Sequence, residues 1–305
     1  MRGNGTKLEW EYAQLFDVES RTPLESWWQE QPSSIAVGRM GYKTKTIKSG
    51  KQMEVEIYPI FGRTQEQKAR KEKQKISSEA MARHNLEAAR RHLVRLANCN
   101  FTEKDLHVTL TYSGQTPTFE QAQKDVRNFL RAIKRRRKKQ GLPEAKYIYT
   151  IEDGENDEEK RIHWHMFSIK RRRENGEEKR IHCHMFLSGG ISREEIEKLW
   201  AKGYANCDRL QPGEEGLAAL ARYITKSAKN RKKWCCSKNL KKPKVHISDV
   251  KMSNRRVKLI ARGLEAEAKE IMRKAWPGWE YTGLTVRYSD RIDGVYIRGK
   301  MRKVA

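Results

Sequence analysis

The chain has 305 residues, of which 65 are Lys or Arg and 39 are Asp or Glu, so its formal net charge is +26 at pH 7. This length suits one large domain or two smaller ones, and the composition excludes collagen-like and low-complexity chains. A charge of this size makes the compact state repel itself. We therefore expect a polyanionic partner, with nucleic acid as the first candidate and an anionic membrane surface as the alternative.

Membrane insertion and disulfide bonding are both disfavoured. No apolar stretch reaches the roughly 20 residues that span a bilayer, and the first residues lack the apolar segment of a signal peptide. The five cysteines are an odd number at irregular spacing with no CxxC pair, which argues against a zinc knuckle or a disulfide framework. We therefore expect no membrane partner and a soluble, cytoplasmic protein with reduced thiols.

The first third of the chain predicts an arm, a hairpin and a long helix. Residues 1–35 have no sustained periodicity and are interpreted as an N-terminal arm. Residues 41–61 alternate apolar and polar side chains about a Ser-Gly pair, which predicts two strands. The charged stretch 64–97 has helical spacing in its second half, so we assign 36–100 to a hairpin followed by this helix.

The remaining sequence predicts an α+β fold, with a mainly antiparallel sheet and helices packed on it. We expect the core at 101–230 and an extension at 231–305 that ends in a hairpin. Within the core, strands are predicted at 107–113, 146–152 and 204–210, and helices at 119–139, from Ser192 to about 202, and at 214–228. The extension predicts a further helix near 260–275.

The helix predicted at 119–139 is strongly basic on one side. Its apolar side repeats at helical spacing, and its other side carries cations that suit phosphate contacts. The DNA-binding residues predicted there are Arg127, Arg131, Lys134 and Arg135.

A short motif occurs twice. Residues 159–167 (EKRIHWHMF) and 178–186 (EKRIHCHMF) differ at one position, and each contains His-x-His. In a strand, His182 and His184 point to one face with about 7 Å between their Cα atoms, and His163 with His165 would do the same. A hairpin would bring Glu152 beside such a pair. Two imidazoles and a carboxylate suit a divalent ion, whereas half-buried structural histidines are the alternative interpretation.

Tyr223 lies at the edge of the apolar stripe of the helix predicted at 214–228, where a tyrosine often serves only to cover the core. Beside a metal-polarised phosphate, however, a tyrosine hydroxyl is the group that a DNA-joining transesterification requires. Lys226 follows three residues later, further toward the polar side of the same helix.

These motifs carry a resemblance to a known family. HVTLTYS, KYIYTIEDG, RIHCHMFLSGGISREEIEKLW and EEGLAALARYITK, in this order, resemble the HUH endonucleases that initiate rolling-circle replication. In particular, they resemble single-tyrosine replication-associated proteins of phages and mobile elements of Gram-positive bacteria. The resemblance covers about residues 36–305, and its specific part is 107–226.

The resemblance implies a role for each site residue. His182, His184 and Glu152 would bind Mg²⁺ or Mn²⁺, Tyr223 would become linked to a 5′ phosphate, and Lys226 would be an accessory cation. The substrate would be single-stranded DNA at a replication origin. The basic residues of the 119–139 helix would then line a path for the strand that leads to the ion and Tyr223.

The sequence departs from the family pattern in carrying two His-x-His copies. We assign the metal site to the second copy because the family motif runs without interruption from it into the following helix. Residues 157–177 are then an inserted hairpin. The pair His163 and His165 remains the alternative ligand pair.

Two other functions compete with this interpretation. A non-enzymatic DNA-binding protein would use the basic helix and keep the histidines as structural groups, and a non-haem iron oxygenase would use two His and one carboxylate. The high positive charge argues against the oxygenase. No GxxxxGK[ST] motif is present, so we expect unwinding to come from a host helicase.

Overall fold

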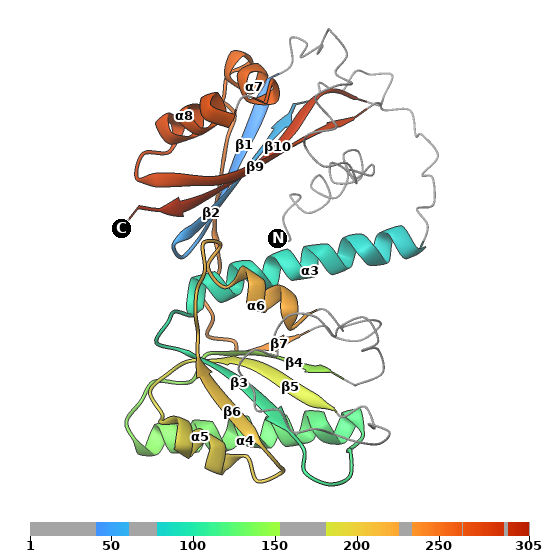
Figure 1. The fold of residues 1–305 in the computed structure, drawn as a ribbon, viewed down its shortest axis with the longest axis vertical. Helices are drawn as coiled ribbons and strands as arrows, with labels where there is room; N and C mark the ends of the chain where they lie inside the picture. Colours follow the sequence, from blue (N-terminus) through green and yellow to red (C-terminus); the bar gives the residue numbers. More distant parts are fainter. Residues whose placement is uncertain are drawn as a thin grey trace. The chain divides into compact units, whose positions relative to one another are not determined.

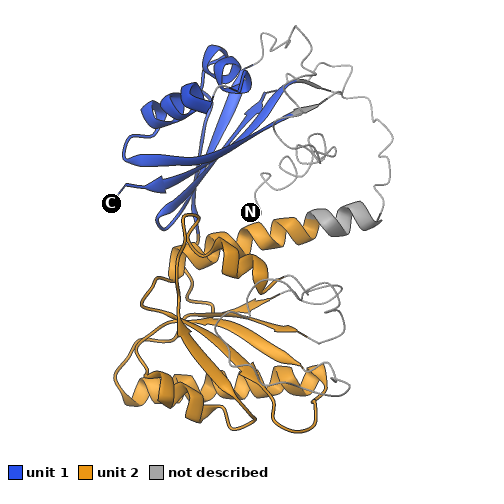
Figure 2. Cartoon of the chain, viewed as in Figure 1, with its two compact units in different colours: residues 1–76, 243–305 blue, residues 77–242 orange. Residues whose placement is uncertain are grey.

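The computed structural model has two compact units, each built on its own antiparallel sheet (Figure 1). One unit comes from within residues 1–76 and 243–305, and the other from within 77–242 (Figure 2). The structure describes residues 41–60, 78–152, 181–225, 234–263, 265–289 and 292–304. The predicted arm and the first His-x-His copy lie outside these ranges.

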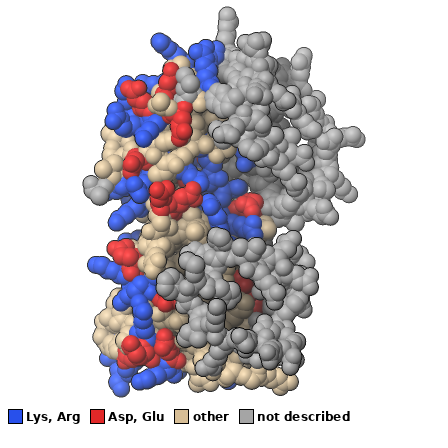
Figure 3. Space-filling view, in the orientation of Figure 1, with Lys and Arg blue, Asp and Glu red and all other residues tan. Residues whose placement is uncertain are grey.

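The described surface is charged throughout. Lys and Arg side chains are interspersed with Asp and Glu on the face shown in Figure 3. Within the described ranges, every helix is too short or too polar to cross a membrane.

The 77–242 unit is built on a five-stranded sheet with strand order β6-β3-β5-β4-β7, and each neighbouring pair is antiparallel. This confirms the predicted α+β class with mainly antiparallel strands. The strands are β3 (Leu106–Thr111), β4 (Tyr147–Glu152), β5 (His182–Leu187), β6 (Ala205–Arg209) and β7 (Cys235–Cys236).

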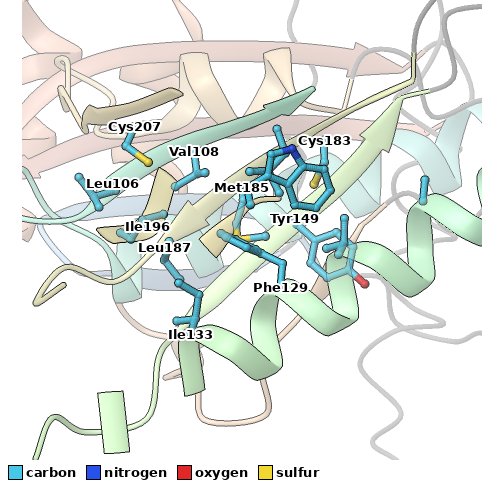
Figure 4. Close-up of a cluster of buried hydrophobic side chains, with 14 of the residues drawn as sticks. Leu106, Val108, Phe129, Ile133, Tyr149, Cys183, Met185, Leu187, Ile196 and Cys207 are labelled. Carbon is cyan, nitrogen blue, oxygen red and sulfur yellow. The ribbon is translucent and has the colours of Figure 1, made fainter. Parts of the chain in front are cut away.

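One face of this sheet is covered by α4 (Phe119–Lys139) and α5 (Arg193–Leu199). Figure 4 shows α4 turning Phe129 and Ile133 toward side chains of the sheet. Both helices begin at the side-chain caps that the sequence suggests, since Thr118 Oγ1 accepts from the Gln121 N–H and Ser192 Oγ from the Glu195 N–H. The buried residues of the sheet on this face include Leu106, Val108, Leu110, Cys183, Met185 and Leu187.

The opposite face is covered by α3 (Ser78–Asn100) and α6 (Ala218–Tyr223). Ile148 and Phe186 of the sheet are buried with a set of side chains from α3, α6 and their flanks that includes Leu93, Leu96, Ala97, Leu217, Ala221 and Ile224. Helix α6 is shorter than the predicted 214–228 because Gly213 and Gly216 pair in a turn before it begins. Residues 226–228 lie outside the described ranges.

The other unit has strand order β8-β1-β2-β10-β9, with α7 (Asn254–Ala261) and α8 (Glu265–Ala275) on one face. The two predicted hairpins are present, and Gly50 supplies the positive φ of 62° in the first turn. The predicted single helix at 260–275 is wrong, because the chain breaks at Gly263, whose φ is 81°. The strands are β1 (Tyr42–Ser49), β2 (Gln52–Pro59), β8 (Lys244–Ser248), β9 (Trp279–Ser289) and β10 (Ile292–Lys303).

We expect Ile133→Ala to destabilise the 77–242 unit by about 2–5 kcal/mol, because it leaves a cavity between α4 and the sheet. Ile133 is 0% exposed. Guanidinium denaturation followed by circular dichroism measures the loss. The control Arg135→Ala, at an exposed position of the same helix, should stay within about 0.5 kcal/mol of the parent. Equal losses in the two variants would contradict this packing.

Candidate functional site

Strand register brings three of the predicted site residues together. Glu152 at the end of β4 is the direct cross-strand partner of His182 on β5, and His184 follows on the same face. The His182 Nε2 lies 3.2 Å from Glu152 Oε2. Ligand atoms of Glu152, His182 and His184 all lie within 4.8 Å of one another, so the group can hold a metal ion.

Burial supports a binding role for this group. Glu152 is 8% exposed and His184 is 5% exposed, while His182 is only partly buried. A buried carboxylate is stable only beside a cation or several donors, and a buried pair of imidazoles supplies nitrogen ligands without adding negative charge. The donor set therefore fits a divalent cation that is reached from one side.

Thr109 of β3 fixes the orientation of His184. Its Oγ1 lies 3.3 Å from His184 Nδ1, because Thr109 and His184 are direct partners across the β3–β5 pair. A hydrogen bond at Nδ1 leaves Nε2 as the nitrogen that faces an ion, which is how metal-binding imidazoles are commonly held. The strand period placed Thr109 on this face, but the sequence did not identify its partner.

His107 also packs against the group from β3. Its ring stacks on His184 with centroids 5.4 Å apart and planes inclined by 16°. Burial lowers the pKa of His107, and the nearby Asp208 carboxylate opposes this shift. Sequence analysis missed His107, because a single histidine in an alternating strand gives no indication of what it stacks on.

Tyr223 at the end of α6 completes the arrangement. Its ring meets the His184 ring edge to face, with centroids 5.4 Å apart and an interplanar angle of 70°. Tyr223 is 45% exposed, whereas Ala218 and Ala221 of the same helix are buried. The structure therefore brings the predicted nucleophile beside a predicted metal ligand and within reach of solvent.

Asn98 of α3 sets the position of α6. Its Oδ1 accepts from the Leu217 N–H at 2.8 Å, and its Nδ2 donates to the Glu215 carbonyl at 3.4 Å. Gly216 between them has a φ of 66°, and a Cβ there would lie 2.5 Å from Asn98 Oδ1. Only glycine fits this turn. Neither residue was identified from the sequence, because their roles depend on how two distant helices pack.

The predicted DNA-binding residues lie on a different side of the sheet. They belong to α4, whose apolar side packs on the face opposite His184 and Tyr223 (Figure 4). Arg127 and Arg135 are exposed, Arg131 donates to Asn128 at 3.0 Å, and Lys134 pairs with Glu144 at 2.5 Å. The expected path along α4 to the ion and Tyr223 therefore does not follow from the fold.

One member of the same basic run is structural. Arg137 is 4% exposed, and its guanidinium donates to the backbone carbonyls of Pro143 and Gly189 at 2.6 and 2.8 Å. Burial lowers the pKa of Arg137, opposed by the charge of Asp105. Lys226 and the alternative pair, His163 with His165, lie outside the described residues.

Comparison with known proteins agrees with this geometry. Residues 105–228 match a family model of replication-associated proteins, the ORF2 family. This range contains the central strands, the three candidate ligands and Tyr223. The match supports a replication initiator family that acts on DNA. No curated protein and no solved structure matches the chain.

We expect Thr109→Val to weaken Mn²⁺ binding by about 10- to 100-fold, because it removes the hydroxyl at His184 Nδ1 while preserving side-chain volume. Isothermal titration, or electron paramagnetic resonance of free Mn²⁺, measures the affinity. Thr109→Ser keeps the hydroxyl and should bind Mn²⁺ nearly as the parent does. Parental affinity in Thr109→Val would show that this hydrogen bond does not orient the ligand.

Proposed function

We propose that this protein is a replication initiator that cleaves single-stranded DNA at an origin by tyrosine transesterification, as an HUH endonuclease does. The observation that carries the proposal is the contact of the exposed Tyr223 ring with His184, a member of the Glu152–His182–His184 group. A non-enzymatic DNA-binding protein has no need of a solvent-accessible phenol beside a metal-binding group. The match at residues 105–228 supports the same function.

In the proposed reaction the Tyr223 oxygen attacks phosphorus and its proton passes to solvent or a nearby base. The bond between phosphorus and O3′ breaks, and O3′ takes up a proton to become a free hydroxyl. The products are a 5′-phosphotyrosine link and a 3′ end that can prime synthesis. One phosphodiester replaces another, so the step requires no nucleoside triphosphate, and attack by a 3′ hydroxyl on the phosphotyrosine rejoins the strand.

Glu152, His182 and His184 would hold the ion. A bound Mg²⁺ or Mn²⁺ supplies charge stabilisation at the phosphoryl oxygens. Carboxylates suit both ions, and the two imidazoles favour Mn²⁺ as the more tightly bound ion. Lys226 is proposed as an accessory cation for the scissile phosphate.

The proposal extends to the cellular setting. Unwinding would be supplied by a host helicase in the cytoplasm of a bacterial cell that carries the phage or plasmid. The basic side of α4, with Arg127, Arg131, Lys134 and Arg135, remains a predicted DNA contact on the other side of the sheet.

Tyr223→Phe should bind single-stranded DNA as the parent does but form no covalent adduct, because it lacks only the attacking oxygen. The parent, incubated with an origin oligonucleotide and Mn²⁺ in the absence of oxygen, should give an adduct that mass spectrometry maps to Tyr223. Omitting oxygen separates this chemistry from that of an iron oxygenase. An adduct on another tyrosine, or no difference between the two proteins, would refute the proposal.

Replacing each histidine pair by alanine tests the ligand assignment. H182A/H184A should abolish adduct formation, because it removes two of the three ligands beside Tyr223. The matched variant H163A/H165A changes the same residue types in the other motif copy and should retain the activity. If H182A/H184A still nicks DNA while H163A/H165A does not, the assignment to the second copy is wrong.

A further inference from the structure

The DNA strand beside Tyr223 needs cationic contacts on the face of the sheet that α3 and α6 cover. Helix α4 packs on the opposite face, so its cations do not supply them. Because Tyr223 and α6 pack with α3, the surface beside them is formed by α3 and by the segment 234–242. The inference below rests on the function proposed above and concerns how its substrate is held.

Asn100 ties the segment 234–242 to the end of α3. The Asn100 Nδ2 donates to the Lys241 carbonyl at 2.8 Å, and the Asn100 Oδ1 accepts from the Lys241 N–H at 2.7 Å. This pair of hydrogen bonds fixes the backbone of Lys241, while the side chains of Lys241 and Lys242 remain exposed. Two cations are thus presented next to α3 on a backbone that does not move away from it.

Trp234 connects this surface with the metal-binding group. Its ring lies 5.8 Å from the His92 ring of α3, with the planes inclined by 36°. Trp234 also lines a small cavity with Thr150 and Ile151, the two residues that precede Glu152 on β4. The indole therefore lies between α3 and the strand end that supplies the carboxylate ligand.

Cations surround this pair of rings. Burial lowers the pKa of His92, and the charges of Arg95 and Lys242 lower it further, which places both cations near the imidazole. The imidazole is neutral at neutral pH as a result. A flat indole and a neutral imidazole bordered by Arg95 and Lys242 combine stacking surfaces with phosphate-binding groups.

We propose that His92, Arg95, Trp234 and Lys242, here called the α3 platform, bind the segment of single-stranded DNA that leads to Tyr223. Unpaired bases stack on aromatic rings whatever their sequence, and cations beside the rings contact the backbone. Bases in a duplex are already stacked on one another and cannot use such rings. The partner of this surface is therefore a single strand, and the platform holds it without selecting the nick site.

Binding measurements test the platform separately from the chemistry. Each variant is made in the Tyr223→Phe background and titrated in EDTA with a fluorescent oligothymidylate of about 10 nucleotides, a length that one such surface can hold. Arg95→Glu/Lys242→Glu should weaken binding by about tenfold or more and lower the slope of log affinity against log salt by about 1.4, since two phosphate contacts are lost. Arg127→Glu/Arg131→Glu on α4 makes the same change in net charge and should stay within about twofold of the parent.

The double-charge variants have two outcomes that overturn the inference. One is affinity of Arg95→Glu/Lys242→Glu within twofold of the parent. The other is an equal loss in the α3 and α4 variants, which would reduce the effect to overall charge. Circular dichroism melting of each variant confirms that the fold is retained.

Photocrosslinking tests the same surface in the unmutated protein. Oligothymidylate that carries 5-iodouracil should crosslink to a peptide containing Trp234, and crosslinks confined to α4 would overturn the inference. A platform that binds DNA in a protein that forms no tyrosine adduct would refute the proposed function alone. An adduct that forms at parental rate in Arg95→Glu/Lys242→Glu with unchanged DNA affinity would refute the platform alone.

Discussion

The antiparallel register of β3, β5 and β4 is the constraint from which the candidate site follows. It puts Glu152 opposite His182 and places Thr109 and Thr150 on either side of His184. Side chains alternate between the two faces, so a slip of one residue would send the histidines into the core beneath α4. Cys183 and Met185, which are buried on the reverse face, hold this register. The same apolar packing that stabilises the sheet therefore sets the geometry of the metal-binding group.

Tyr223 depends on a second constraint, the packing of α6 on α3. Helix α6 has six residues, too few to be stable alone, so its position is set by what surrounds it. The hydrogen bonds of Asn98 to both sides of Gly216 fix where the helix begins. The distance between the phenol and the ligands is thus controlled by α3, which supplies no ligand itself. In this fold the nucleophile and the α3 platform belong to one packed layer.

These two constraints explain what the sequence could predict. Glu152 and His182 were predictable as neighbours, because strand alternation and a hairpin connection bring them together whatever covers the sheet. The face that α4 covers was not predictable, because an amphipathic pattern shows which side of a helix is buried and not against which sheet face. Thr109 and Asn98 act through residues far along the chain, so no local pattern marked them. The break at Gly263 was missed because apolar spacing continues across it.

The net charge of +26 can now be separated into two effects. Helices on opposite faces of a sheet are about 20 Å apart, twice the usual layer spacing of about 10 Å. This exceeds the Debye length of about 8 Å at physiological salt, so cations on α4 draw DNA toward the protein but do not position a strand at Tyr223. Part of the α4 charge is also neutralised locally, by Glu144 at Lys134 and by Glu195 at Arg136. Positioning therefore requires cations within a few ångströms of the strand, on the face that carries the nucleophile, and charge counted along the sequence does not reveal which cations these are.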